Sequence, residues 1–416
     1  MNFSELNLNP SIYKAIEICG YKKPTPIQSS SIPSILTGKD IVASAQTGTG
    51  KTAAFTLPAL HMLKTNNTKD KWRKTRVLIL TPTRELATQI TKACDTYGKF
   101  IKFNLTSLMG GMSYKEQIRG LKKGPDIIVA TPGRLIDHIE SGRVDLSGVE
   151  MLILDEADRM LDMGFIDDVN LIAKQTPKSR QTLLFSATVD SKINKIVNRL
   201  LKDPARIDLS DKKLAPKKIA QEIYVADSSK HKDKLLNHFM TESNIYKAII
   251  FSATKLNADK LAKRLREDGH NALALHGDLK QNVRDKTIRK LKTGKIQYIV
   301  ATDVAARGLD IDDLSHVFNY DLPRFSEDYV HRIGRTGRAG KSGIAISFAL
   351  PNEKTHLDKI ERYVGQKIAL ENIEGLESQS GFKAGTSSKK KPKRNRRTSD
   401  SFKKKSQFKK AKKRYQ

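Results

Sequence analysis

Short apolar runs alternate along the chain with longer segments in which apolar residues recur at helical spacing. Such runs are typical of strands that are buried on both faces of a parallel sheet, with helices packed over the sheet. The predicted strands lie at 40–44, 77–81, 127–130, 151–154 and 182–186 in the first half of the chain, and at 219–225, 247–251, 271–275, 297–301, 316–320 and 343–349 in the second. The pattern therefore predicts an α/β fold with a doubly wound parallel sheet in each half.

A break in this pattern separates the two halves. The segment DPARIDLSDKKLAPKK at 203–218 carries two prolines and a cluster of charges but no clear period, which is typical of a linker. A chain of 416 residues is long enough for two domains, each with its own core. We expect a first domain at 1–207, a linker at 208–217, a second domain at 218–365 and a C-terminal extension at 366–416.

The C-terminal extension loses the apolar pattern at about residue 380. From Lys383 onward it contains 16 Lys or Arg residues and a single acid, Asp400. A segment with so much charge and so few apolar residues does not bury enough surface to fold, so we expect it to be disordered. Phe402, Phe408 and Tyr415 lie among the cations, which favours an RNA tether that binds by counterion release and by stacking of the aromatic rings. The alternative is a tail that only improves solubility.

The charge of the whole chain also points to a polyanionic partner. Lys and Arg outnumber Asp and Glu by 76 to 45, which gives a net charge of +31 and favours nucleic acid. The longest apolar runs, such as VLIL at 77–80, are far shorter than the ~20 residues that span a bilayer, and the start MNFSELNLNP does not resemble a signal peptide. Cys19 and Cys94 provide neither a disulfide framework nor metal-ligand spacing. We expect a cytoplasmic protein without a membrane partner.

The first chemical motif is ASAQTGTGKTAAF at 43–55. A strand leads into a glycine-rich turn and then into a helix, so that backbone amides and the helix dipole converge on a site that favours an anion. In such a phosphate-binding loop, Lys51 would reach the β- and γ-phosphates and the Thr52 hydroxyl would ligate Mg²⁺. Ala45 stands where the general pattern has glycine, and the alternative is a turn that merely joins strand to helix.

The second motif is LILDEAD at 152–158, which places carboxylates directly after an apolar strand. Asp155 at the carboxyl end of this strand is suited to holding Mg²⁺, and Glu156 to orienting or deprotonating the attacking water. The alternative is that these acids cap the following helix, whose first turn also favours negative charge. Together with the phosphate-binding loop, the acids indicate a nucleoside-triphosphate site.

Further motifs follow in a fixed order through both halves. They are Phe3, GYKKPTPIQ at 20–28, PTRELA at 82–87, GG at 110–111, TPGR at 131–134, SAT at 186–188, FSAT at 251–254, HGDLKQNVR at 276–284, ATDVAARGLDI at 301–311 and HRIGRTGR at 331–338. With these motifs the chain resembles the DEAD-box ATP-dependent RNA helicases, and most of all their bacterial RhlE-like group, over about residues 1–365. The resemblance implies two tandem RecA-like domains, with ATP between them and RNA bound across both.

The resemblance assigns particular residues to the nucleotide. It implies that Gln28 recognises the adenine edge, that Tyr21 stacks on the base and that Asp310 contacts the ribose. It implies that Thr52 and Asp155 hold Mg²⁺, partly through water. The residues implied in nucleotide binding are Tyr21, Gln28, Gln46, Thr47, Gly48, Thr49, Gly50, Lys51, Thr52 and Asp310. Without the resemblance, Tyr21 and Gln28 would be interpreted as surface residues beside a proline-rich turn.

In HRIGRTGR, two arginines resemble arginine fingers, which approach the γ-phosphate from the second domain and neutralise charge in the transition state. These are Arg335 and Arg338. Four basic residues at such close spacing are also compatible with a solvated surface or a simple RNA patch. The implied catalytic residues are then Lys51, Asp155, Glu156, Arg335 and Arg338.

The resemblance also assigns residues to coupling and to RNA. Those implied in coupling ATP hydrolysis to domain closure are Asp158, Ser186, Thr188 and His331. Those implied in RNA binding are Arg84, Gly111, Thr131 and Arg134 in the first domain, and Gln281, Arg284 and Thr302 in the second. Small, hydroxyl and arginine side chains are suited to holding phosphates without reading bases, so we expect weak sequence preference.

The function implied is RNA-stimulated ATP hydrolysis coupled to local, largely sequence-independent unwinding of RNA. One alternative is an RNA-binding chaperone whose ATPase only gates its affinity for RNA, with little unwinding. Another is a DNA helicase that translocates, whose ATPase rate would grow with strand length. The resemblance points to ribosomal or RNA-decay complexes as partners.

Overall fold

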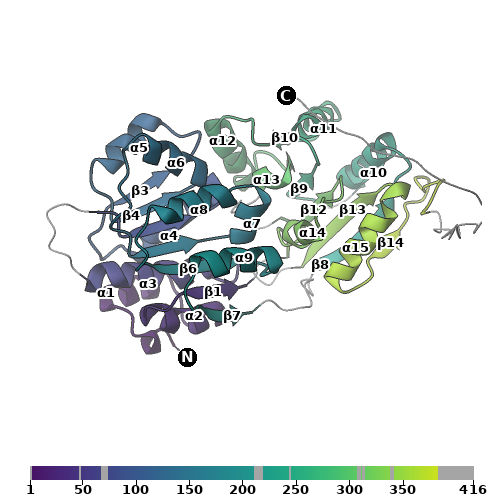
Figure 1. Cartoon of the computed structure of the whole chain (residues 1–416). Helices are drawn as coiled ribbons and strands as arrows, with labels where there is room; N and C mark the ends of the chain where they lie inside the picture. Colours follow the sequence, from purple (N-terminus) through teal and green to yellow (C-terminus); the bar gives the residue numbers. More distant parts are fainter. Residues whose placement is uncertain are drawn as a thin grey trace, which may run out of the picture. The chain divides into compact units, whose positions relative to one another are not determined.

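The computed structural model describes residues 2–45, 48–66, 74–209, 219–242, 245–306, 311, 314–337 and 342–382. Residues 1–382 form one compact unit, and the predicted tail from Lys383 onward lies outside the described residues. Within this unit, helices cover both faces of two parallel sheets (Figure 1). We call each sheet together with its helices a lobe.

The first lobe is built on a sheet of seven parallel strands. They are β1 (Ile41–Ser44), β2 (Val77–Leu80), β3 (Leu105–Leu108), β4 (Ile127–Ala130), β5 (Met151–Leu154), β6 (Gln181–Ser186) and β7 (Ala205–Asp208). Their order across the sheet is β3-β4-β2-β5-β6-β1-β7. From β1 the chain passes to β2 and out to the edge strand β3, and it then returns through β4, β5 and β6 to the opposite edge at β7, as the sequence predicts for a doubly wound fold.

Successive residues of each strand face opposite cores. In β2, Val77 and Ile79 pack in the same cluster as Phe55, whereas Leu78 and Leu80 pack in the cluster that contains Leu135. All four residues of β2 are fully buried, which is why the strand is a continuous apolar run. Each central strand therefore stabilises two hydrophobic layers at once.

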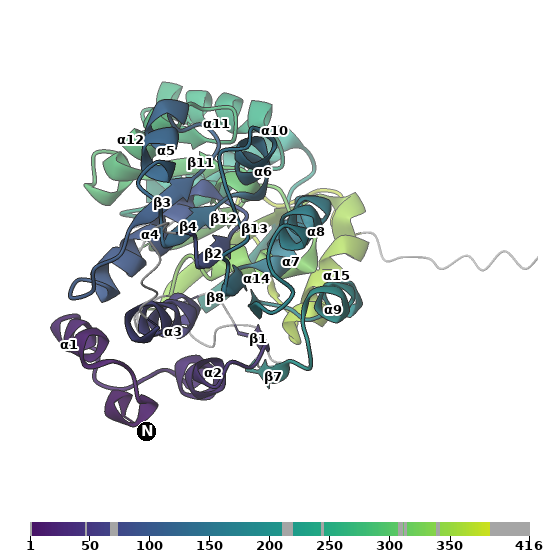
Figure 2. The same ribbon diagram turned by 60° about the vertical axis from the view of Figure 1, so that its left-hand side comes forward.

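The helices of the first lobe lie on the two sides of this sheet (Figure 2). They are η1 (Phe3–Leu6), α1 (Pro10–Ile18), α2 (Pro26–Leu36), α3 (Lys51–Thr65), α4 (Arg84–Tyr97), α5 (Tyr114–Leu121), α6 (Pro132–Glu140), α7 (Ala157–Asp162), α8 (Ile166–Lys174) and α9 (Ser191–Leu200). Residues of α1 to α4 belong to one core cluster, and residues of α6 to α9 belong to the other.

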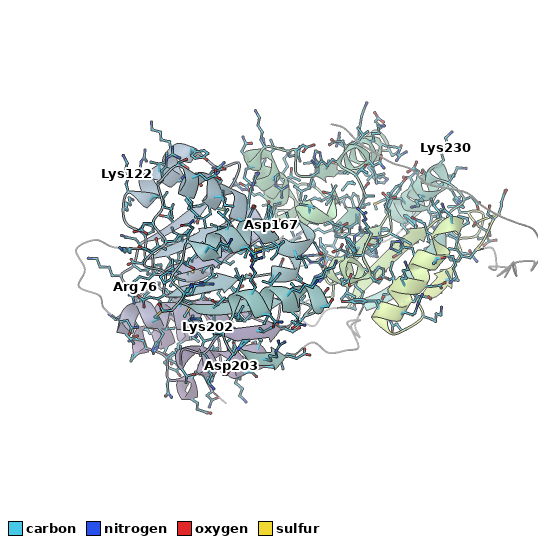
Figure 3. All side chains as sticks on the ribbon, in the orientation of Figure 1. Arg76, Lys122, Asp167, Lys202, Asp203 and Lys230 are labelled. Atoms are coloured by element: carbon cyan, nitrogen blue, oxygen red, sulfur yellow. The ribbon has the colours of Figure 1, made fainter. Side chains whose placement is uncertain are left out.

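The second lobe repeats this architecture with a second sheet of seven parallel strands. They are β8 (Ile219–Val225), β9 (Ala248–Phe251), β10 (Ala272–Leu275), β11 (Tyr298–Ala301), β12 (His316–Asn319), β13 (Gly343–Ala349) and β14 (Ala369–Glu371), in the order β10-β11-β9-β12-β13-β8-β14. The helices are α10 (Ser229–Glu242), α11 (Lys255–Glu267), α12 (Gln281–Lys292), α13 (Asp303–Ala306), α14 (Ser326–Ile333), η2 (Pro351–Glu353) and α15 (Lys354–Val364). Charged side chains such as those of Lys122, Asp167 and Lys230 are exposed around the two lobes (Figure 3).

Every strand predicted from the sequence is present, but β3, β7 and β14 were not predicted. The prediction was wrong for residues 205–208, which form strand β7 although they were assigned to the irregular segment 203–218. All three strands lie at sheet edges, where one side has no neighbouring strand among the described residues and polar residues are tolerated. The LTSL, ARID and ALE sequences therefore lack the continuous apolar run that marks a central strand.

The segment after α15 completes the second lobe. Strand β14 pairs with β8, and the carboxylate of Asp227 accepts hydrogen bonds from the Ser378 hydroxyl at 2.6 Å and from the Gln379 and Ser380 amides at 2.9 and 3.0 Å. Phe382 then packs against the apolar cluster that contains Tyr329. The C-terminal extension is thus anchored to the second lobe up to Phe382.

Candidate active site

Three strand ends bring the predicted ATP motifs together. Strand β6 lies between β5 and β1, with Ser186 beside Ser44 and Leu184 beside Leu154. Because all three strands are parallel, the segments that follow them leave from the same edge of the sheet. The phosphate-binding loop, the DEAD carboxylates and the SAT segment are therefore neighbours.

The phosphate-binding loop depends on two glycines. Gly48 and Gly50 have φ angles of +85° and +94°, which residues with a Cβ atom rarely adopt. Gly50 is the N-cap of α3, so Lys51 and Thr52 lie in the first helical turn, where the amides are free to bind an anion. Thr49 lies between the two glycines, and the predicted residues Gln46 and Thr47 lie outside the described residues.

Lys51 and Asp155 are two buried charges of this site. Their relative exposures are only 7% and 3%, yet Lys51 Nζ and Asp155 Oδ1 have no hydrogen-bond partner among the described residues. Burial raises the pKa of Asp155 to about 7, and the nearby Lys51 ammonium opposes this shift. Burying such charged groups without hydrogen-bond partners costs free energy unless a bound ligand supplies the partners. The Lys51 ammonium is suited to binding phosphate, and the Asp155 carboxylate and the Thr52 hydroxyl are suited to binding Mg²⁺. These groups therefore fit the predicted ligands ATP and Mg²⁺.

Glu156 has an unusual backbone conformation. Its φ and ψ angles are 52° and 53°, in the left-handed region, and it is the N-cap of α7 without a capping hydrogen bond from its side chain. A residue other than glycine in this region stores strain on the order of 1 kcal/mol. A side-chain cap of α7 therefore does not explain the Glu156 carboxylate.

Gln28 connects the predicted adenine site to the phosphate-binding loop. Its Oε1 accepts a hydrogen bond from the Thr25 amide at 3.0 Å, and its Nε2 donates to the Gly50 carbonyl at 3.1 Å. A carboxamide has one further donor and one further acceptor position, which remain for an adenine edge. Tyr21 is 45% exposed, and its hydroxyl lies 3.3 Å from that of Tyr97, so a face of its ring is accessible for stacking.

The predicted coupling residues of the first lobe are in contact. Asp158 Oδ2 accepts hydrogen bonds from the Ala187 amide at 3.2 Å and from the Thr188 hydroxyl at 3.4 Å. The Ser186 hydroxyl donates to the Thr188 carbonyl at 2.6 Å. The DEAD motif and the SAT segment are therefore joined directly by side chains.

The predicted residues of the second lobe are only partly described. His331 lies in the last turn of α14, and Arg335, with 6% relative exposure, follows this helix. Asp310 and Arg338 lie outside the described residues. Arg332, which was not predicted, anchors α14 because its Nε and Nη2 donate to the two carboxylate oxygens of Asp303 at 2.6 and 2.8 Å. Arg332 and Arg335 are buried, so they do not form a solvated surface.

The predicted RNA residues of the first lobe gather along the other half of the same sheet edge. Strands β2, β4 and β3 are neighbours there, and the PTRELA, TPGR and GG motifs follow them in that order. A cleft of about 270 Å³ is lined by Pro82, Thr83, Arg84, Glu85, Gly110, Thr131, Gly133, Arg134, Met163, Phe165, Gly277, Arg284 and Val304. Gly111 lies beside it, since a Cβ atom at this position would overlap the Arg84 guanidinium.

Residues from the second lobe reach this cleft. Arg284 donates to Glu85 through both Nε, at 3.0 Å, and Nη2, and to the His276 carbonyl at 3.1 Å. Arg84 Nη1 donates to Gln281 Oε1 at 3.1 Å. Three of the predicted RNA residues are therefore engaged with protein groups here. Thr302, which has 8% relative exposure, lies directly after β11, the strand beside β10.

Comparisons with known proteins match this arrangement. The family described as DEAD/DEAH box helicase matches residues 25–196, and the helicase conserved C-terminal domain matches residues 230–340. The ATP-dependent RNA helicase SrmB of Haemophilus influenzae is 44% identical over 377 residues, which are 90% of this chain and 85% of SrmB. This chain belongs to the DEAD-box helicase family.

Other helicases of the family are similar over most of the chain. The DEAD-box ATP-dependent RNA helicase CshA of Bacillus cereus is 44% identical over 366 residues, 88% of this chain and 69% of CshA. The structure of S. cerevisiae Dbp5 bound to RNA and ADP BeF3 has a TM-score of 0.80 at 32% identity and covers 89% of this chain and 95% of its own. The structure of Mss116 bound to ssRNA and UDP-BeF has a TM-score of 0.80 at 31% identity, with coverages of 90% and 80%. These structures confirm the predicted fold.

The helicase also has a buried ion pair that sequence reasoning missed. Arg159 Nη1 lies 2.7 Å from Asp328 Oδ1, and the two side chains have relative exposures of only 4% and 6%. Arg159 directly follows Asp158 of the DEAD motif, and Asp328 lies on α14, three residues before His331. The sequence places a basic residue after the DEAD motif but gives no sign of its distant partner. In the described part of the helicase, no helix is long and apolar enough to cross a membrane.

Proposed function

We propose that this protein hydrolyses ATP in response to RNA and uses the hydrolysis cycle to separate short stretches of RNA duplex. The observation that carries the proposal is the meeting of residues 48–50, 155–156 and 186–188 after neighbouring strands, with Lys51 Nζ and Asp155 Oδ1 buried and without a hydrogen-bond partner among the described residues. The names of SrmB and CshA, and the RNA and ADP BeF3 bound to Dbp5, support the same activity.

In this proposal the first turn of α3 binds the phosphates of ATP. The amides after Gly48 and the Lys51 ammonium would hold the β- and γ-phosphates. Thr52 and Asp155 would hold Mg²⁺, partly through water, and the ion would supply positive charge beside the phosphates. Glu156 would orient the attacking water and accept its proton.

The base and the ribose would be held by other segments. Gln28 would pair with the adenine edge through its remaining donor and acceptor, and Tyr21 would stack on the base. Asp310 would contact the ribose, and Arg335 with Arg338 would neutralise charge on the γ-phosphate during hydrolysis. Gln46, Thr47 and Thr49 would complete the phosphate-binding loop.

Coupling and RNA binding would use the rest of the same sheet edge. The hydrogen bonds of Asp158 with the segment 186–188 would transmit the state of the nucleotide site to His331 and α14. The residues proposed for RNA are Arg84, Gly111, Thr131, Arg134, Gln281, Arg284 and Thr302. Because they are arginines, hydroxyls and small residues, they would hold phosphates rather than read bases.

The remaining parts of the proposal rest on sequence. We propose a first domain at 1–207, a linker at 208–217, a second domain at 218–365 and an extension at 366–416, with the tail from Lys383 as an RNA tether. We also propose action in the cytoplasm, within ribosomal or RNA-decay complexes. Crosslinking the protein to cellular RNA and sequencing the bound fragments would test the partners.

Glu156→Gln tests the chemistry directly. The amide keeps the shape of the side chain but loses the base, so we expect the variant to bind ATP and RNA while its RNA-stimulated kcat falls by about 10²-fold or more. Glu140→Gln, at an exposed position of α6, is the matched control and should turn over normally. Turnover of the Glu156 variant near that of the unmodified protein would contradict the assignment.

Strand displacement separates the proposed helicase from the alternatives. With ATP the protein should release a short RNA strand over many turnovers, whereas a non-hydrolysable analogue should support at most one binding event. A chaperone with ATP-gated affinity would show RNA-stimulated hydrolysis without displacement. A translocating DNA helicase would show stimulation by DNA that grows with strand length.

A further inference from the structure

Tyr114 lies beside the predicted RNA residue Arg134 and has no assigned role. It is the first residue of α5, directly after the loop that follows β3, and its relative exposure is 39%. Tyr114 belongs to none of the sequence motifs. Its separation from Arg134 along the chain matches no helical or strand repeat, so the sequence does not indicate that the two side chains are neighbours. Only the packing of α5 against the start of α6 brings the two side chains together.

The guanidinium of Arg134 is held on three sides. Its Cζ atom lies 4.1 Å from the centroid of the Tyr114 ring, and its Nη1 donates to the Met112 carbonyl at 3.4 Å. Arg134 Nε lies 3.3 Å from Asp137 Oδ2, without the alignment of a hydrogen bond, and the same oxygen accepts the Tyr114 hydroxyl at 3.1 Å. The ring face, the carbonyl and the carboxylate together fix the direction of the arginine.

The position of Tyr114 is itself fixed. The buried side chain of Gln117 binds the loop before α5, because its Oε1 accepts from the Met109 amide at 3.1 Å and its Nε2 donates to the Met109 and Met112 carbonyls at 3.1 and 3.3 Å. The His138 ring, which is fully buried, lies 5.0 Å from the Tyr114 ring. The aromatic ring is therefore a rigid support and not a mobile surface side chain.

A fixed arginine binds a phosphate better than a free one. Arg134 belongs to the lining of the cleft that also contains Arg84 and Thr131. A free arginine side chain has many rotamers, and ordering it on binding opposes affinity; an aromatic face that orders it beforehand removes part of this cost. Stacking on an aromatic ring also leaves the edge of the guanidinium available for hydrogen bonds with phosphate oxygens.

We propose that Tyr114 is a positioning residue of the RNA cleft, whose ring holds the Arg134 guanidinium in the orientation that binds an RNA phosphate. This inference rests on the proposed role of Arg134 in RNA binding. It assigns to Tyr114 an effect on RNA affinity that is transmitted entirely through Arg134. The aromatic ring of Tyr114 holds the guanidinium, and the hydroxyl only helps to orient the ring.

The test compares Tyr114→Leu, Tyr114→Phe, Arg134→Ala and the double variant Tyr114→Leu with Arg134→Ala. For each, the RNA concentration that gives half-maximal ATPase is measured at several salt concentrations, together with kcat at saturating RNA and the thermal midpoint. We expect Tyr114→Leu to raise the half-maximal RNA concentration by roughly two- to fivefold, the size of a cation–π contact at a partly exposed site. Tyr114→Phe keeps the ring and should remain near the unmodified protein.

Two features distinguish positioning from a general structural effect. In Tyr114→Leu the slope of log affinity against log salt should become shallower by up to ~0.7, as expected when the protein neutralises one phosphate fewer, while kcat and the thermal midpoint stay unchanged. In the Arg134→Ala background, Tyr114→Leu should have no further effect. The double variant should therefore equal Arg134→Ala alone.

Each contrary result has a separate meaning. An equal loss of RNA affinity in Tyr114→Phe and Tyr114→Leu would assign the effect to the hydroxyl and overturn the proposal. Additive losses in the double variant would mean that Tyr114 binds RNA independently, for example by stacking on a base, and would also overturn it. If Arg134→Ala binds RNA normally, the assumed role of Arg134 is wrong and the inference fails with it; if the unmodified protein shows no RNA stimulation, the proposed function itself is wrong.

Discussion

Gln28 Nε2 donates a hydrogen bond to the Gly50 carbonyl at 3.1 Å, so the residue predicted to recognise adenine also supports the phosphate-binding loop. The approach is close, since a Cβ atom at position 50 would lie 2.5 Å from the same nitrogen. A glycine is needed at position 50 both for its φ angle of +94° and for this contact. Base recognition and phosphate binding are thereby connected through one side chain.

This contact predicts two effects of Gln28→Ala. The variant should lose preference for ATP over GTP, because the adenine edge loses its two-point partner. It should also bind ATP more weakly, because the Gly50 carbonyl and the Thr25 amide lose their partners. The measurement is kcat/KM for both nucleotides. An unchanged ATP:GTP ratio with weaker binding of both would show that Gln28 supports the loop without reading the base.

The raised pKa of Asp155 predicts a pH-dependent loss of stability in the absence of nucleotide. Burial raises its pKa to about 7, whereas an unfolded chain has a value of about 3.9. The folded protein therefore binds more protons between these values, and the contribution of this carboxyl to stability, present below about pH 4, is lost as the pH rises through about 7. Asp155→Asn, which cannot ionise, should be free of this loss.

We expect Asp155→Asn to raise the urea midpoint of unfolding at pH 8 and to have a smaller effect at pH 5, with chelator present and nucleotide absent. Asp167→Asn is the matched control, because Asp167 is exposed on α8. A difference between Asp155→Asn and the unmodified protein that does not change with pH would rule out ionisation of the buried carboxyl as its cause.

The buried pair of Arg159 and Asp328 predicts energetic coupling between the DEAD helix α7 and α14. Arg159→Gln and Asp328→Asn should each lower the RNA-stimulated kcat by roughly tenfold, because each removes one partner of a buried ion pair. The double variant should be no worse than the more severe single variant. Fully additive losses would mean that the two residues act separately.

A surface pair provides the control for this experiment. Lys354 Nζ lies 2.5 Å from Asp358 Oδ1 on α15, but both side chains are 37% exposed. Exposed pairs contribute little because water screens them, so Asp358→Asn should leave kcat unchanged. A comparable loss in this variant would show that removal of any carboxylate from the second lobe lowers activity.

Truncation after Phe382 tests the proposed tether. The cut leaves the hydrogen bonds of Asp227 with residues 378–380 and the packing of Phe382 intact, so the second lobe should stay folded. We expect a higher half-maximal RNA concentration and a flatter salt dependence, by ~0.7 in slope for each phosphate of a single strand that the tail neutralises. The kcat at saturating RNA should change by less than about twofold. Equal affinity and equal salt slope for both proteins would exclude the tether.

Much of the fold was predictable because a central strand is buried on both faces, and its sequence is therefore a continuous apolar run. Val77 to Leu80 are all apolar since both faces of β2 are covered, and the same holds for the strand that ends at Leu154. Edge strands such as Ala205–Asp208 were missed because one open side relaxes the demand for apolar residues. The closeness of the motifs was predictable because segments that follow parallel strands leave from one edge of the sheet.

The sequence by itself determined the two sheets, the family and the candidate chemistry at Lys51, Asp155 and Glu156, since these depend on local pattern and on spacing within single motifs. The tertiary structure decided which motifs are neighbours, because strand order places β6 between β5 and β1 and separates the nucleotide half of the sheet edge from the half with Arg84 and Arg134. It also decided the pairings of Arg159 with Asp328 and of Tyr114 with Arg134. The first pairing exists only once the two lobes have packed together, and the second only once α5 and α6 have packed within the first lobe, so neither can be inferred from spacing along the chain.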